Sequence, residues 1–324
     1  MSHSSAGGRP LDLATCNNPR GWAVPPLPDE VWRLAPDDDD GFELDAVHYY
    51  GNANLLPVAG RHAAINLLPH LFPPAMVACI GPLEHEYALA WKAAGHRPRL
   101  LQNATLARAV GAATPFVLIA NPNPNPNPNP ITGSHLLREN LLDAASQLGK
   151  RGGWLIVDET LADPLPDQSV AAVAGMAEAP RLIVLRSLAE FFGLAGAPVA
   201  FLLASPDLLA RLKSLRGPRT IPGPSRAVAR MALADAAWQA EARRQLAAAT
   251  DRLHQLLAPF GEVRSTALFA ALSTPQAADL HDHLARNDIL VHFFEQGPLL
   301  RFGLPGGEAG WQRLATALAA WRSA

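Results

Sequence analysis

Short apolar runs alternate with helix-like stretches through the middle of this chain, and this alternation limits the folds that it can adopt. Several runs are continuously apolar, which is typical of strands covered on both faces of a mainly parallel sheet. The predicted strands cover residues 76–80, 98–101, 115–120, 154–157, 182–185 and 199–204. Between them lie stretches with helical spacing of apolar residues. The pattern predicts a layered α/β domain.

Further along the chain the order of elements changes. One helix of the α/β region is predicted to be capped by Ser134 and to end at Gly149. A long alanine-rich helix is then expected over residues 225–257, where its length suggests a connector. A small α+β domain should follow, with a helix at 277–287, strands at 289–293 and 299–302, and a final helix. We therefore predict an N-terminal segment packing on the small domain (1–44), a large domain (45–224), and the connecting helix with the small domain (225–324).

Two segments of biased composition fall in predicted loops. Residues 37–40 are four aspartates, which we interpret as a solvated loop because contiguous carboxylates lack the spacing of a calcium loop. Residues 121–130 are five Asn-Pro pairs, and each proline removes a donor and moves the preceding residue out of the helical region. An irregular or extended loop is expected there, at the sheet edge where open α/β proteins bind ligands.

Composition argues against several classes of protein. With 49% apolar and 17% charged residues the chain should be folded and soluble, and a net charge of −2 gives no electrostatic reason to bind nucleic acid. No apolar run approaches the roughly 20 residues of a membrane helix, and the N-terminus lacks a secretory signal, so we expect a cytoplasmic protein. Cys16 and Cys79 are predicted to be free thiols. No metal site is predicted, since His281 and His283 lie two apart on a helix and point apart.

Five blocks of sequence resemble those of one enzyme family, in the same order and with matching spacing. They are "YYGNANLLPVAGRHAAINLLPHL", "NPNPITG", "WLIVDET", "RSLAEFFGLAGAPVAF" and "LLRFGLPG". The chain thus resembles the fold-type-I, pyridoxal-phosphate-dependent class I and II aminotransferases, and within them the threonine-phosphate decarboxylases of cobalamin biosynthesis. The resemblance covers nearly all of the chain. It implies a three-layer large domain with a mainly parallel sheet, a small α+β domain and a homodimer.

The resemblance also implies a site built around pyridoxal phosphate. In this family a lysine forms an imine with the cofactor aldehyde, and an aspartate keeps the pyridine nitrogen protonated. Asp158 stands at the aspartate position, and the alternative interpretation is a strand-end carboxylate that caps a loop. Arg301 stands where an arginine clamps the carboxylate of an amino acid or amino-acid phosphate, and its alternative is a salt bridge within the small domain. The other positions matched to cofactor contacts are Ser187, Asn129 or Asn127, Gly60 and Arg61.

The matched motifs also place several changes at this site. The lysine of the family's Ser-x-x-Lys block is Glu190 here, and a carboxylate cannot form a Schiff base. The arginine expected to hold the cofactor phosphate is Pro198. Two interpretations of Arg61 stay open: it supplies the charge that Pro198 lacks, or it is an ordinary surface arginine at a helix N-terminus. Further departures are Glu84 at or near the stacking aromatic, His62 in the Gly-Ser-Gln turn, Ile131 inserted after the Asn-Pro pairs, and His292 in place of an arginine.

These changes predict a degenerate member of the family. A charge-assisted hydrogen bond to phosphate is worth roughly 1.5–3 kcal/mol, so losing the arginine should weaken cofactor binding about ten- to a hundredfold. Pyridoxal phosphate is expected to bind without a covalent bond if it binds, since Lys92, Lys150 and Lys213 are not placed to reach it. Glu190 is interpreted as filling the site, with a catalytic base as the alternative. Two other functions stay open: an active decarboxylase or aminotransferase with a non-covalently bound cofactor, or a site for a different small ligand.

Overall fold

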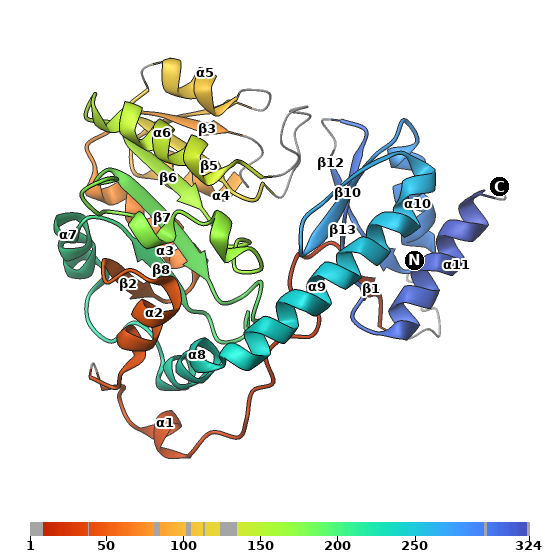
Figure 1. The fold of residues 1–324 in the computed structure, drawn as a ribbon, viewed down its shortest axis with the longest axis horizontal. Helices are drawn as coiled ribbons and strands as arrows, with labels where there is room; N and C mark the ends of the chain where they lie inside the picture. The colour runs from red at the N-terminus through yellow and green to blue at the C-terminus, as the bar shows by residue number, and fades with distance from the viewer. Residues whose placement is uncertain are drawn as a thin grey trace. The chain divides into compact units, whose positions relative to one another are not determined.

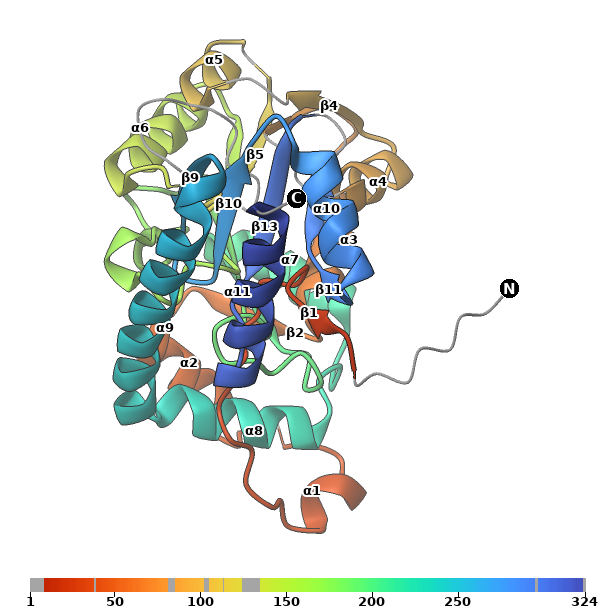
Figure 2. The ribbon, with the colours of Figure 1, turned by 90° about the vertical axis from the view of Figure 1, so that its right-hand side faces the viewer.

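The chain folds into two compact units. The computed structural model describes residues 9–37, 39–80, 85–101, 105–112, 114–123, 135–294 and 297–322. Gly21–Gln245 form the larger unit, and Met1–Arg20 with Leu246–Ala324 form the smaller one. Helix α9 (Ala236–Leu257) passes from the first into the second (Figures 1 and 2). The N-terminal boundary thus falls after residue 20, whereas the sequence pattern places it after residue 44. Within the described residues, no helix has the length and apolarity to cross a membrane.

The larger unit is built on a seven-stranded sheet with the order β2-β8-β7-β6-β5-β3-β4 (Figure 1). Strands β3 to β7 run parallel to one another, and β8 runs antiparallel to both β2 and β7. The strands are β2 Leu55–Val58, β3 Met76–Ile80, β4 Arg97–Leu101, β5 Phe116–Ala120, β6 Trp154–Asp158, β7 Leu182–Ser187 and β8 Ala200–Leu203. All six strands predicted from apolar runs are confirmed to within two residues at either end.

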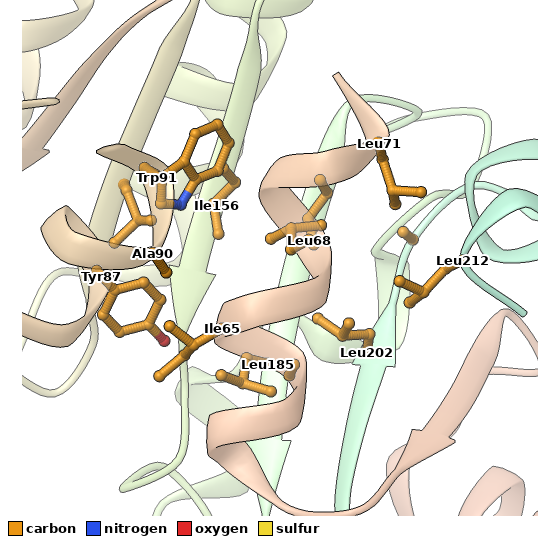
Figure 3. Packing of buried hydrophobic residues seen from close by; sticks show 14 of the residues in the cluster. Ile65, Leu68, Leu71, Tyr87, Ala90, Trp91, Ile156, Leu185, Leu202 and Leu212 are labelled. Atoms are coloured by element: carbon orange, nitrogen blue, oxygen red, sulfur yellow. The ribbon is translucent and has the colours of Figure 1, made fainter. Parts of the chain in front are cut away.

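One face of this sheet is covered by α3, α4 and α7. Their bounds are Arg61–Leu67, His85–Ala93 and Pro206–Arg216. Figure 3 shows Ile65 of α3 beside Leu185 of β7, and Trp91 of α4 beside Ile156 of β6. These side chains belong to one continuous cluster of buried apolar residues, which fixes both helices against the strands.

The opposite face is covered by α2 and α6, with α5 packed against α6. Their bounds are Phe42–Tyr50, Arg138–Gly149 and Leu106–Gly111. Side chains alternate between the faces of a strand, so Phe201 points away from its neighbour Leu202. The Phe201 ring lies 5.6 Å from that of Phe42 and 5.3 Å from that of Tyr50 in α2. Burial on both faces explains the continuous apolar runs and confirms the three-layer α/β architecture.

The start of α6 differs from the prediction. The helix begins at Arg138, and the residue before it, Leu137, has an extended backbone and makes no side-chain cap. Ser134, the predicted cap, lies outside the described residues, and the helix starts three residues later than a cap at this position would place it. The predicted end at Gly149 is confirmed.

The alanine-rich stretch is two helices, and the prediction of one helix over residues 225–257 is wrong. Helix α8 (Gly223–Ala234) ends at Asp235, whose φ of −85° and ψ of 71° leave the helical region. Oδ1 of Asp235 accepts the Trp238 N–H at 3.0 Å, and Oδ2 accepts the Trp22 Nε1–H at 3.1 Å. Because the Asp235 carboxylate satisfies a donor at the start of α9, the backbone can turn there.

The acidic run at residues 37–40 is not simply solvated, which corrects the interpretation made from its composition. Asp40 accepts from Nε and Nη2 of Arg226 in α8, both at 2.7 Å. Burial opposes ionisation of Asp40, but hydrogen bonds from Arg226 and the Phe42 N–H outweigh it and lower the pKa of the carboxyl. The run therefore helps to hold the start of α2 against α8. Asp38 lies outside the described residues, and the described part of the chain contains no group of three potential metal ligands.

The smaller unit is an α+β structure, as predicted. Its antiparallel sheet has the order β12-β13-β10-β9, and α10 and α11 lie side by side (Figure 2). The bounds are β9 Glu262–Ser265, β10 Phe269–Ser273, α10 Ala277–Arg286, β12 His292–Phe294, β13 Leu299–Gly303 and α11 Glu308–Arg322. Strand β1 (Leu11–Asp12) pairs in parallel with β11 (Ile289–Leu290), which ties this early segment of the chain to the smaller unit. The single strand predicted at 289–293 is thus two short ones.

Candidate functional site

Three polar residues meet where neighbouring parallel strands end in the larger unit. Asp158 is the last residue of β6, Ser187 is the last residue of β7, and Asn121 follows β5 directly. The Asn121 N–H donates to the Asp158 carbonyl oxygen at 2.8 Å. The carboxyl ends of parallel strands in open α/β sheets are the usual place for ligand binding. The structure therefore places Asp158 and Ser187 at the carboxyl ends of two neighbouring strands, where a ligand site was predicted.

The Asp158 side chain is buried, with 4% of its surface exposed, and both of its oxygens accept hydrogen bonds from the chain itself. Oδ1 accepts the Thr160 N–H at 3.0 Å. Oδ2 accepts the Tyr87 hydroxyl at 2.7 Å and both Nε and Nη2 of Arg61 at 3.3 Å. An ionised carboxylate has about four acceptor sites. Three of the four donors therefore share Oδ2, and Oδ1 accepts the fourth.

Arg61 is not an ordinary surface arginine, because its side chain is only 16% exposed and is paired with two acids. It is the first residue of α3, and its Nη1 lies 3.1 Å from Oε2 of Glu86. The other oxygen of Glu86 lies 3.0 Å from Nε2 of His62. The Arg61 guanidinium also lies over the Tyr87 ring, 5.4 Å from its centroid. Helices α3 and α4 thus hold one cation against Asp158.

Tyr87 was not singled out in the sequence, although it contributes the shortest bond to Asp158. Its side chain is 1% exposed, so its hydroxyl needs a buried partner. The only local signal is a tyrosine in an otherwise apolar helical stripe, "YALAW". A stripe of this kind normally belongs to the core, and Figure 3 shows the Tyr87 ring within the buried apolar cluster between α3, α4 and the sheet.

Glu190 lies three residues after Ser187 and close to Asp158 and Arg61. A hydrogen bond from Ser187 and the Arg61 charge favour its ionised form, but burial and the Asp158 charge outweigh them and raise the pKa of Glu190 to about 7. Its Oε2 is buried and has no hydrogen-bond partner among the described residues. Near neutral pH this carboxyl is therefore a mixture of neutral and ionised forms.

Gly60 and Pro198 face each other beside α3. Gly60 has a φ of 89°, in the region that favours glycine, and a Cβ added there would lie 3.0 Å from Cβ of Pro198. The proline therefore packs directly on the turn that precedes Arg61. Its ring brings neither a charge nor an N–H donor to this turn.

A buried ion network lies behind the two strand ends. Arg186, Glu159 and Asp163 are each no more than 2% exposed. Nη1 of Arg186 lies 2.9 Å from Oε2 of Glu159, and Nη2 pairs with Oδ1 of Asp163. Burial disfavours the cation, but the charges of Asp163 and Glu159 raise the pKa of Arg186 above its ordinary value. This network was not predicted, and its signal in the sequence is a charged residue beside each of two predicted strand ends.

Arg301 belongs to the smaller unit, in β13. Its Nη2 donates to the Ala14 carbonyl oxygen at 2.9 Å, and its Nε is buried without a hydrogen-bond partner in the described part of the chain. His292 is its partner across the antiparallel pair β12-β13. Burial and the Arg301 charge lower the pKa of His292. The alternative interpretation of Arg301, a salt bridge within the small domain, is thus not seen among the described residues, where Arg301 bonds to a backbone carbonyl instead.

The remaining predicted residues divide into two groups. Lys92, Lys150 and Lys213, the three lysines of the chain, are exposed and lie in or just after helices α4, α6 and α7. Other predicted residues lie outside the described part of the chain: Glu84, Asn127, Asn129 and Ile131. The expected loop at residues 121–130 is described only as far as Asn123.

Comparison with known proteins identifies the family. The family model for aminotransferase class I and II matches residues 99–292. The chain is 41% identical over 310 residues to threonine-phosphate decarboxylase of Pseudomonas aeruginosa, covering 95% of this chain and 91% of that protein. It is 37% identical over 327 residues to threonine-phosphate decarboxylase of Sinorhizobium sp, covering 97% and 93%.

Solved structures show the same fold. Histidinol-phosphate aminotransferase from Sinorhizobium meliloti, in complex with pyridoxal-5'-phosphate, matches with a TM-score of 0.81 at 20% identity, covering 97% of this chain and 91% of that one. The aspartate-bearing strand end, the mainly parallel sheet and the sequence matches agree. This chain belongs to the class I and II aminotransferase family.

Proposed function

We propose that this protein is a threonine-phosphate decarboxylase-like member of the family that forms no imine with pyridoxal phosphate. Glu190 is the observation that carries the proposal, because it stands where the family's Ser-x-x-Lys block predicts the lysine. A carboxylate has no amine to condense with an aldehyde. The two relatives named threonine-phosphate decarboxylase support the choice of this branch.

The residues at the ends of β6 and β7 do not fit the family's cofactor. Oδ2 of Asp158 already accepts from Tyr87 and Arg61, so a pyridinium N–H that approaches this oxygen would have to displace one of them. Pro198, where an arginine is expected for the phosphate, gives that group no charge. Ionised Glu190 would repel a dianionic phosphate. We therefore propose that pyridoxal phosphate binds weakly and without a covalent bond.

A protein of this kind would act as a pseudoenzyme. We propose a cytoplasmic homodimer that serves as a dimer partner or regulator of an enzyme in cobalamin biosynthesis. The support is the family relationship together with the loss of several cofactor contacts at once. Its binding surface would then matter more than turnover of an amino acid or amino-acid phosphate.

One observation favours a second candidate, an active enzyme with a non-covalently held cofactor, or a site for another small anion. Arg301 keeps a buried Nε without a hydrogen-bond partner among the described residues. A buried donor of this kind is costly unless a partner binds it, and a substrate carboxylate is such a partner. Release of product from threonine phosphate or an amino donor, above the level of a Glu190→Ala control, would support this candidate.

Borohydride reduction tests the first proposal. Pyridoxal phosphate added to the wild-type protein is expected to give no saturable imine absorbance, and peptide mapping after reduction should find at most scattered adducts on the three exposed lysines. The Glu190→Lys variant, which restores an amine at this position, should give an adduct on residue 190 at high cofactor concentration. A stoichiometric wild-type adduct on Lys92, Lys150 or Lys213 would contradict the proposal.

A further inference from the structure

We infer that Arg61 occupies the contact on Asp158 that the family's cofactor would make through its ring nitrogen, so that the ion pair excludes pyridinium ligands. The inference deepens the proposed function and rests on it for the identity of Asp158. Two Arg61 N–H groups converge on Oδ2 of Asp158, which also accepts the Tyr87 hydroxyl. A pyridinium N–H is likewise a cationic donor in search of a carboxylate oxygen. The two cations therefore compete for one acceptor.

Of the four donors on Asp158, those of Arg61 are the ones able to leave. The Thr160 N–H belongs to the backbone two residues along the same chain, so it cannot be withdrawn without moving the strand end. The Tyr87 bond is short, at 2.7 Å, and its ring is 1% exposed within the core. The Arg61 bonds are longer, at 3.3 Å, and the guanidinium is carried on a flexible stem.

Glu86 holds Arg61 in this position and acts as a positioning residue. Its Oε2 lies 3.1 Å from Nη1 of Arg61, so the guanidinium bridges Glu86 in α4 and Asp158 in β6. Glu86 is 41% exposed, whereas Asp158 is 4% exposed. Water therefore screens the outer contact more than the inner one. Removing the charge of Glu86 should loosen Arg61 without touching Asp158.

The charge balance explains why the ion pair persists without a ligand. Asp158 is buried, and the neighbouring Glu190 is partly ionised near neutral pH. Arg61 is the guanidinium that faces both carboxyl groups. Removing Arg61 leaves the buried negative charge of Asp158 uncompensated, and a cationic ring could then compensate it. Loss of Arg61 should therefore lower stability and at the same time raise the affinity for a pyridinium ligand.

Pyridoxamine 5'-phosphate is a suitable probe, since it has no aldehyde and its binding is independent of any imine. The Arg61→Ser variant is expected to bind this probe at least about tenfold more tightly than wild type, because a hydrogen bond to one charged acceptor contributes about that factor to affinity. Calorimetry measures both affinities. The 1-deaza analogue, which lacks the ring nitrogen, should show no such gain. Arg33→Ser is the matched control, because Arg33 lies in an exposed ion pair, and it should leave both affinities unchanged.

Glu86→Gln provides a second variant, in which Arg61 is retained in the sequence but is held less firmly. It should give a smaller gain in affinity for pyridoxamine phosphate, and circular dichroism and thermal melting would establish that each variant is folded. Weaker binding to Arg61→Ser would overturn the inference and assign Arg61 to the phosphate. An equal gain for the deaza analogue, or no gain in either folded variant, would overturn it as well. The proposed function would fail on a different result, a covalent adduct of pyridoxal phosphate in the wild-type protein, so the two failures can be told apart.

Discussion

Arg186 and Glu159 form a buried ion pair that joins two neighbouring strand ends, with Nη1 and Oε2 2.9 Å apart. Glu159 directly follows Asp158, and Arg186 directly precedes Ser187. The pair therefore ties together the two residues that lie at the candidate site. The backbone ladder sets the spacing of β6 and β7, and the ion pair adds a side-chain link at the ends of these strands.

Replacing Arg186 by Met should destabilise the protein strongly. The change leaves Glu159 and Asp163 buried without a cation, and breaking a buried pair in this way costs about 3–5 kcal/mol. Urea unfolding followed by circular dichroism would measure the loss. Arg33→Met, in an exposed pair, should cost less than about 1 kcal/mol. Equal effects of the two substitutions would show that the network adds little to stability.

Stability should depend on pH through Glu190. Its pKa is raised from 4.5 in the unfolded reference to about 7 in the fold, so its contribution is fully present below pH 4.5 and is lost as the pH rises to about 7. Relative to Glu190→Gln, the wild type should lose on the order of 3 kcal/mol of unfolding free energy between pH 4.5 and 8. Urea unfolding at several pH values, taken as the difference between the proteins, measures this. A constant difference would show that Glu190 titrates normally.

Gly60 should not tolerate a side chain. Alanine at a φ of 89° costs about 1–2 kcal/mol, and its Cβ would lie 3.0 Å from Pro198. Gly60→Ala should therefore lower the unfolding free energy by roughly 2 kcal/mol, combining backbone strain with the contact. A double-mutant cycle with Pro198→Gly separates the two, because this change removes the Cβ that faces Gly60 and its own backbone effect cancels in the cycle. If the cycle shows no coupling, the Pro198 contact contributes nothing to the loss.

The strands could be predicted because burial on both faces leaves a continuous apolar run, which the sequence displays directly. The break at Asp235 could not be predicted, because alanine favours helix on both sides of it. The hydrogen bond that Asp235 accepts comes from Trp22, 213 positions away in the sequence. Asp158 was found through its motif. Its pairing with Arg61 joins residues 97 positions apart, and no local pattern shows which acid a buried arginine will contact.

The same reasoning explains why Glu159 and Arg186 were missed. Each follows or ends an apolar run, where a charged residue is normally taken as the point at which the chain reaches solvent. Here the two charges remain inside because each strand end is covered and each charge has a partner. A rule that pairs opposite charges at the ends of neighbouring predicted strands would have proposed this contact.

Restoring the lysine should reveal how much Arg61 opposes the cofactor. In Glu190→Lys, pyridoxal phosphate can condense with the new amine, but its ring nitrogen still competes with Arg61 for Oδ2 of Asp158. In Arg61→Ser/Glu190→Lys that acceptor is open, so half-saturation of the imine absorbance should need about tenfold less cofactor. Arg33→Ser/Glu190→Lys should behave as the single variant does. If the double variant needs more cofactor than Glu190→Lys, Arg61 assists binding. That result would mean that the cofactor phosphate draws Arg61 away from Asp158.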